Sequence, residues 1–182
     1  ELEQKYKIEY AKGLTGDKAE EAKEDIDDFF LQFVEQGLID LNDFTRLLMV
    51  ELKKGYAIEI TVKGFASPLA ETDYNVNLTK RRIASLVNYL KTINEGEFIP
   101  YLDGTADNGA VLTFVKIPFG EYTANSLVSD NLNDQKNSVY SRKAALERKI
   151  EIQSVQFAKP NTSSVPKEIS DKAILTRAST IF

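Results

Sequence analysis

Residues 62–90 read VKGFASPLAETDYNVNLTKRRIASLVNYL, and this stretch predicts a strand, a loop and a helix in succession. Over residues 56–65, apolar and polar residues alternate, which indicates a strand with one buried face formed by Ile58, Ile60 and Val62. The loop extends from Gly64 to Asp73 and contains Ser67-Pro68. The helix reaches Asn94 and is closed by Gly96, and its apolar residues recur at helical spacing: Leu78, Ile83, Leu86, Val87 and Leu90.

Three helices are expected before this strand. The first is short and has one apolar stripe, formed by Leu2, Tyr6 and Tyr10. The second covers residues 18–37, because its apolar residues share one face, acids crowd its first turns, and Gly37 stands where a C-cap is expected. The third is N-capped by Asn42 or Asp40 and ends at Lys53-Lys54-Gly55.

Further strands are expected after the helix. Of two apolar stretches, 98–102 and 111–117, at least the second should be a strand, which Pro118 stops. A polar stretch then leads into a helix around residues 139–146, followed by a strand in which Ile150 and Ile152 alternate with polar residues. Beyond Phe157 the sequence predicts a linker, and after it a weak helix that includes Ile169, Ala173 and Ile174.

These elements predict an α+β fold. Because the strands alternate instead of being apolar throughout, the sheet should be covered on one side only. We therefore expect a two-layer sandwich in which a mixed sheet carries helices on one face. We divide the chain into an N-terminal helical extension (residues 1–37), a main domain (38–157) and a linker with a tail (158–182).

Composition excludes several chemistries. The 182 residues include 23 Lys or Arg and 28 Asp or Glu, for a formal net charge of −5, and they include no His, Cys or Trp. Disulfides, zinc fingers, iron–sulfur sites and His-based catalysis are therefore excluded, and the acidic balance disfavours a dedicated nucleic-acid binder. Phosphate-binding and calcium-binding motifs are missing, so we expect no cofactor and no enzymatic activity. A Ser–Lys or paired-carboxylate hydrolase is the alternative that these residue types leave open.

No apolar run approaches the ~20 residues that cross a bilayer, and the opening ELEQKYKIEY has no signal-peptide core. The chain opens inside an expected helix. We therefore expect it to be one domain of a longer protein.

Two blocks of sequence resemble a known family. The first follows the pattern YN-x-x-L-[ST]-x-x-R-[AI]-x-x-V-x-x-Y-L without a gap, with Leu in place of Val at one position, through Tyr74, Asn75, Leu78, Thr79, Arg82, Ile83, Leu86, Tyr89 and Leu90. This pattern resembles the signature of the OmpA C-terminal-like domain, the peptidoglycan-associating module of Gram-negative envelope proteins. The second block, residues 147–152, is similar to the closing NRRVEI strand of that family. The sequence GFASPL and residues 129–152 resemble the corresponding sequences of the family variant that occurs in large Bacteroidetes envelope proteins.

The resemblance implies non-covalent binding of the peptidoglycan stem peptide through its diaminopimelate residue, at the periplasmic face of the outer membrane. Outer-membrane association would come through other parts of the full-length protein. Arg82 matches the arginine that binds the ligand carboxylate, and Asn75 and Arg148 match further pocket positions. A guanidinium suits this task because it pairs with a carboxylate through two parallel hydrogen bonds.

The chain departs from the family at one position. Where the family has an Asp that meets the ligand ammonium, this chain has the neutral Ser67, and Asp73 or Glu71 on the same loop could substitute. The first strand of the family is not evident either, which would leave a sheet edge open. An alternative function is therefore a structural or protein-interaction module that has lost wall binding.

The individual residues have structural alternatives as well. Arg82 could pair with Asp73 or Glu147 and lock the helix to a strand. Asn75 and Thr79 could cap the helix start, and Ser67 could be a turn residue before Pro68.

Overall fold

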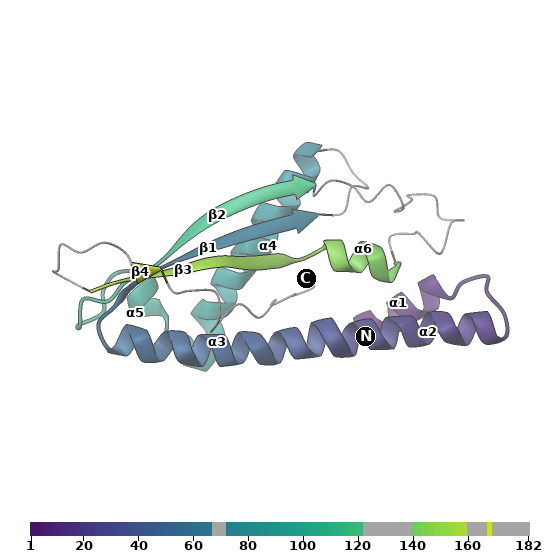
Figure 1. Ribbon diagram of the computed structural model, residues 1–182, viewed down its shortest axis with the longest axis horizontal. Coiled ribbons are helices and arrows are strands. Elements are labelled where there is room, and N and C mark those ends of the chain that lie inside the picture. The colour runs from purple at the N-terminus through teal and green to yellow at the C-terminus, as the bar shows by residue number, and fades with distance from the viewer. Residues whose placement is uncertain (67–71, 122–139, 160–166, 169–182) are drawn as a thin grey trace.

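The structure is a computed structural model that describes residues 1–66, 72–121, 140–159 and 167–168 (Figure 1). In chain order, its elements are α1 (Leu2–Tyr10), α2 (Asp17–Phe29), the π-helical η1 (Phe30–Glu35), α3 (Gln36–Lys53), β1 (Ala57–Ala66), α4 (Thr72–Thr92), the 3-10 helix η2 (Ile93–Gly96), α5 (Ile99–Leu102), β2 (Leu112–Glu121), α6 (Arg142–Glu147), β3 (Ile150–Ala158) and β4 (Lys167–Glu168). Within these ranges, no helix combines the length and apolar content needed to span a membrane.

The strands form one mixed sheet in the order β2-β1-β3-β4. The central strand β1 runs parallel to β2 and antiparallel to β3, so that Ile60 lies opposite Phe114 on one side and Val155 on the other. β3 and β4 are antiparallel. The predicted α+β class with a mixed sheet is confirmed.

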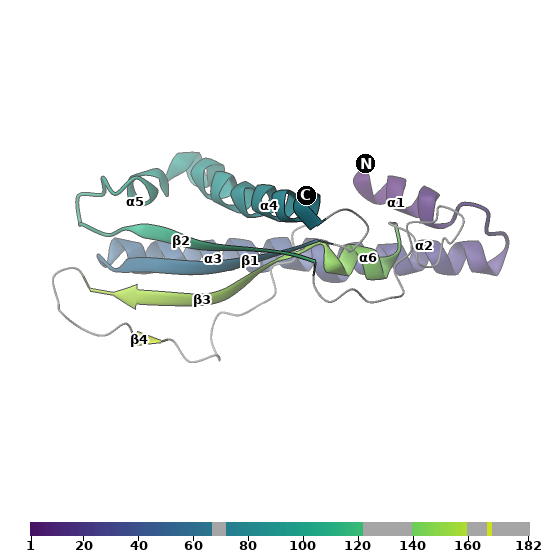
Figure 2. The ribbon, with the colours of Figure 1, turned by 90° about the horizontal axis from the view of Figure 1, so that it is seen from above.

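The main core lies between one face of this sheet and the helices α3 and α4. The buried side chains of β1 pack against Leu48 and Leu52 of α3 and against Ile83 and Leu86 of α4, whereas Glu59, on the other face of the strand, is exposed. Figures 1 and 2 together show α3 and α4 on the same side of the sheet. This arrangement is compatible with the predicted two-layer sandwich.

A long helix replaces the two separate helices expected before β1. The elements α2, η1 and α3 follow one another directly from Asp17 to Lys53. Gly37 therefore lies inside a helix and not at a C-cap, and Asp40 and Asn42 are not N-caps. The prediction was wrong because Gly37 is buried against the rest of the protein, and packing outweighs its cost of about 1 kcal/mol in a helix interior. The expected short helix at the N-terminus is confirmed as α1.

A second, smaller core joins the N-terminal helices to α6. Tyr6 of α1 packs with Ile26, Phe29 and Phe30 of the long helix and with Ala145 of α6. The rings of Phe29 and Phe30 meet edge to face, with centroids 5.6 Å apart. Figure 2 shows α1 lying along the first part of the long helix.

Three further segments differ from what the sequence predicts or leaves open. β2 continues through Pro118 to Glu121, because β2 lies at the edge of the sheet, where proline is tolerated, and the pairing with β1 shifts register directly after Pro118. The apolar stretch 98–102 forms the short helix α5. Lys167 and Glu168 pair with Phe157 and Gln156, so part of the expected tail forms a strand beside β3. The expected loop 119–137 lies mostly outside the described residues, as do the linker 160–166 and the helix around Ile169–Ile174.

Gly64 allows α4 to cross β1 at close range. A Cβ atom at this position would lie 3.0 Å from Cβ of Thr79 and 3.1 Å from its backbone oxygen. The backbone oxygen cannot rotate away as a flexible side chain would, so a larger residue would push α4 from the sheet. Gly64 therefore sets the spacing between the end of β1 and α4, where Arg82 lies.

Candidate functional site

Arg82 lies in the middle of α4, and its guanidinium is held at the end of β1. The side chain is 6% exposed, and Nη1 donates a hydrogen bond to the backbone oxygen of Phe65 over 2.7 Å. Its Nε is buried and has no hydrogen-bond partner among the described residues. An unpaired buried donor costs about 1–3 kcal/mol, so this N–H is an unusual feature that calls for an acceptor.

The surroundings of Arg82 are cationic. Burial and then the nearby Arg148 guanidinium lower the pKa of Arg82 from its usual value to about 10, and Tyr6 and Tyr74 partly oppose this shift. Arg82 therefore still carries its charge at pH 7. Among the residues whose side chains the structure describes, no carboxylate forms an ion pair with it.

Arg148 approaches from a different part of the chain. It lies between the end of α6 and the start of β3 and is half-buried. Its Nη1 donates a hydrogen bond to the hydroxyl oxygen of Tyr6 over 2.6 Å. The structure therefore brings together Arg82 and Arg148, as predicted, and adds Tyr6, which the sequence did not suggest. We call Arg82, Arg148 and Tyr6 the donor cluster.

Two lysines extend the positive charge around Phe65. The ammonium groups of Lys63 and Lys149 lie 5.1 Å and 5.3 Å from the centroid of the Phe65 ring. The backbone N–H of Phe65 donates to the oxygen of Lys149, which joins β1 to the entrance of β3 at this point. The end of β1 thus gathers cationic side chains in a chain whose net charge is negative, and one of them, Lys149, is paired with Glu151.

Asn75 and Thr79 lie inside α4, and neither caps it. Asn75 is 2% exposed and lies in the first turns of a helix that begins at Thr72. The Thr79 hydroxyl donates to the oxygen of Val76 within the helix. The capping interpretation of these two residues is therefore wrong, because α4 begins several residues earlier than the apolar spacing indicated.

Of the acidic residues expected near Arg82, only Asp73 has a side chain that the structure describes. Asp73 lies in the first turn of α4, is exposed, and forms no ion pair with Arg82, so the interpretation of those two as a helix-to-strand lock is wrong. Ser67, Glu71 and the side chain of Glu147 lie outside the described residues.

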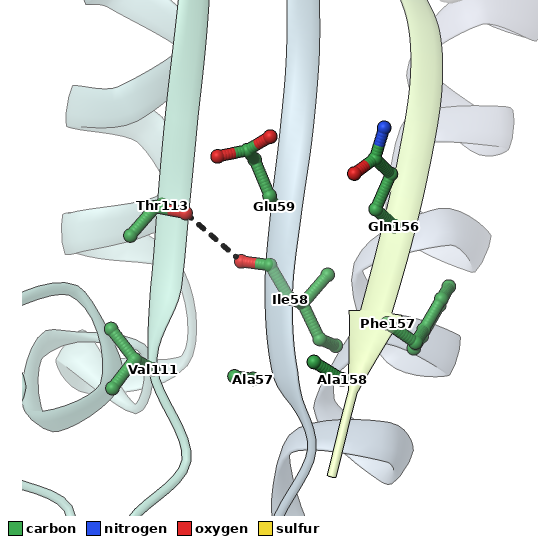
Figure 3. A pocket seen from close by; sticks show the side chains of 8 residues that line it. All are labelled: Ala57, Ile58, Glu59, Val111, Thr113, Gln156, Phe157 and Ala158. Atoms are coloured by element: carbon green, nitrogen blue, oxygen red, sulfur yellow. Dashed lines mark hydrogen bonds between the residues drawn. The ribbon is translucent and has the colours of Figure 1, made fainter. Parts of the chain in front are cut away.

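A shallow pocket of about 180 Å³ lies at the opposite end of β1. Figure 3 shows side chains of three strands around it, including Glu59 of β1, Thr113 of β2 and Phe157 of β3. Among the described residues that line it, Glu59 is the only charged one, and its carboxylate would repel an anionic ligand. This pocket therefore does not suit a carboxylate, whereas the donor cluster does.

Chemically, the donor cluster can donate hydrogen bonds to a carboxylate oxygen. Across the described ranges, no group of three or more acidic residues could hold a metal ion. Comparison of the chain with family models, with curated proteins and with solved structures gives no match. The resemblance to the OmpA C-terminal-like domain therefore stays a prediction.

Proposed function

We propose that this chain is an OmpA-like, non-enzymatic domain that binds peptidoglycan and anchors an outer-membrane or periplasmic protein to the cell wall. The ligand is the stem peptide, held at a diaminopimelate carboxylate by Arg82. The observation that supports this proposal most directly is the buried Nε of Arg82, for which the described part of the chain supplies no acceptor. Arg148 adds positive charge beside it and strengthens the attraction for an anion.

The charge and shape of the group at Arg82 favour a carboxylate over other ligands. A guanidinium presents its N–H groups in a planar fork, and one edge of that fork matches the two oxygens of a carboxylate. The hydrogen bond from Nη1 to Phe65 fixes the orientation of the fork before a ligand arrives. Such preorganisation reduces the entropy lost on binding.

The direct test is sedimentation with purified sacculi. We expect the protein to sediment with the sacculi, and we expect a soluble stem peptide that contains diaminopimelate to release it. Retention in the supernatant at every protein concentration would contradict the proposal.

Ser67→Asp should increase the affinity for this peptide by about tenfold. A charge-assisted hydrogen bond contributes about 1.5–3 kcal/mol against about 1 kcal/mol for a neutral one, and the resemblance implies that an Asp at this position would meet the ligand ammonium. Calorimetric titration of both proteins measures the change. Ser154→Asp is the matched control, since Ser154 lies opposite Thr61 on the uncovered face of the sheet and the added charge is the same. Equal affinities of Ser67→Asp and wild type would contradict the assigned orientation of the ligand.

A second candidate function has one specific observation in its favour. Arg82 is only 6% exposed and joins α4 to the backbone of β1, as a purely structural arginine would. In that case the domain is an interaction module that does not bind the wall. Absence of sacculus binding combined with strong destabilisation on loss of Arg82 would favour this candidate.

A further inference from the structure

The N-terminal helix contributes a side chain to the cluster around Arg82. Tyr6 of α1 is 7% exposed, and its hydroxyl oxygen accepts a hydrogen bond from Arg148. A tyrosine hydroxyl can donate one hydrogen bond while it accepts another. Among the described residues, the Tyr6 hydroxyl has no acceptor for its own proton.

The Tyr6 ring is fixed in place, so the hydroxyl has a defined position. The ring meets Phe30 edge to face with centroids 5.9 Å apart, and Tyr140 in the same way at 5.5 Å. Lys7, the next residue, forms ion pairs with Asp27 of α2 and with Glu3. α1 is thus anchored on the long helix with Tyr6 directed at Arg148.

The hydroxyl of Tyr6 acts electrostatically on the guanidinium of Arg82. The proximity of Tyr6 affects the protonation of Arg82, and so does that of Arg148. The Nε of Arg82 and the hydroxyl of Tyr6 are two nine-tenths-buried donors without acceptors among the described residues. Donors gathered without an acceptor are the complement of an anion, since each oxygen of a carboxylate accepts two or more hydrogen bonds.

We propose that Tyr6 is a ligand-contacting residue whose hydroxyl donates to the bound carboxylate, so that residues 1–37 form part of the binding site. This inference rests on the function proposed above. The carboxylate enters beside Arg148, the half-buried member of the donor cluster. It then receives hydrogen bonds from guanidinium groups of the main domain and from the hydroxyl of the extension.

Tyr6→Phe should weaken binding of the diaminopimelate-containing stem peptide by about tenfold, because a hydrogen bond to a charged acceptor is lost. The ring and its contacts remain, so the thermal midpoint should stay close to that of the wild type. Calorimetric titration measures the affinity. Tyr10→Phe is the matched control, since it removes a half-buried hydroxyl from the same helix and should leave the affinity unchanged.

A double-mutant cycle separates direct contact from positioning of Arg148. If Tyr6 contacts the ligand, Tyr6→Phe should also weaken binding in an Arg148→Met background. If Tyr6 only orients Arg148, the Tyr6 substitution should have no effect there, and the inference fails.

Other outcomes distinguish this inference from the proposed function. A wild-type protein that binds the peptide, together with a Tyr6→Phe variant of equal or higher affinity, overturns the role of Tyr6 alone. A wild-type protein that does not bind the peptide overturns both.

Discussion

We expect Arg82→Met to abolish binding of the stem peptide and to leave the fold intact. Loss of two charge-assisted hydrogen bonds, each contributing about 1.5–3 kcal/mol, should reduce the affinity more than about a hundredfold. The stability should change by less than about 2 kcal/mol. Methionine loses the hydrogen bond to Phe65 but also removes a buried charge that has no carboxylate partner among the described residues. Sacculus sedimentation and urea unfolding measure the two quantities.

Arg46→Met is the matched control for this substitution. Arg46 lies on α3, its side chain is 75% exposed, and it pairs with Asp43. Neither binding nor stability should change measurably, because exposed ion pairs contribute about 1 kcal/mol at most. Unchanged sedimentation of Arg82→Met, with a large loss of stability, would instead assign Arg82 a structural role.

Phe29→Ala should lower the free energy of unfolding by about 3–5 kcal/mol, the cost of an emptied aromatic site in a core. Phe29 is 1% exposed and packs against both Phe30 and Phe33, with ring centroids 5.6 Å and 5.7 Å apart. Because α2, η1 and α3 are continuous, we expect the loss to appear in a single unfolding transition that includes the main core. Thermal unfolding followed by circular dichroism measures it, with a decrease of the midpoint of about 10 °C.

Leu31→Ala provides the comparison on the same helix. Leu31 is 61% exposed, so its truncation should change the stability by less than about 0.5 kcal/mol. Two separate transitions in Phe29→Ala, with the second at the wild-type temperature, would show that the extension folds independently of the sheet.

Local sequence patterns predicted the structure correctly where the burial of one face of an element determines it. The alternation of Ile58, Ile60 and Val62 predicted a strand with one buried face, and the exposed Glu59 between them agrees. The sheet class followed from the same pattern, since a sheet covered on both sides would not alternate. Gly96 was also placed correctly, because its positive φ suits the chain reversal after α4.

Predictions failed where tertiary context overrides a local signal. Gly37 was expected to end a helix, but burial keeps it inside α3. Pro118 was expected to end a strand, but its position at the sheet edge makes the missing N–H harmless. Neither burial nor the place of a strand in a sheet can be read from neighbouring residues.

The candidate site was predicted in part. The sequence placed Arg82 and Arg148 in one pocket through the resemblance, and the structure brings them close enough for Arg148 to lower the pKa of Arg82. Tyr6 was missed because its partner Arg148 is 142 positions away, and its spacing from Leu2 and Tyr10 indicated only a helix face. A long-range contact of this kind leaves no periodic signal.

The central claim is that the guanidinium of Arg82 receives a ligand carboxylate, and its Nε–H can report this directly. Titration of ¹⁵N-arginine-labelled protein with the diaminopimelate-containing stem peptide should shift the Nε–H resonance of Arg82 progressively to saturation, while that of the exposed Arg46 stays in place. An Arg82 resonance that does not move at saturating peptide would contradict the account.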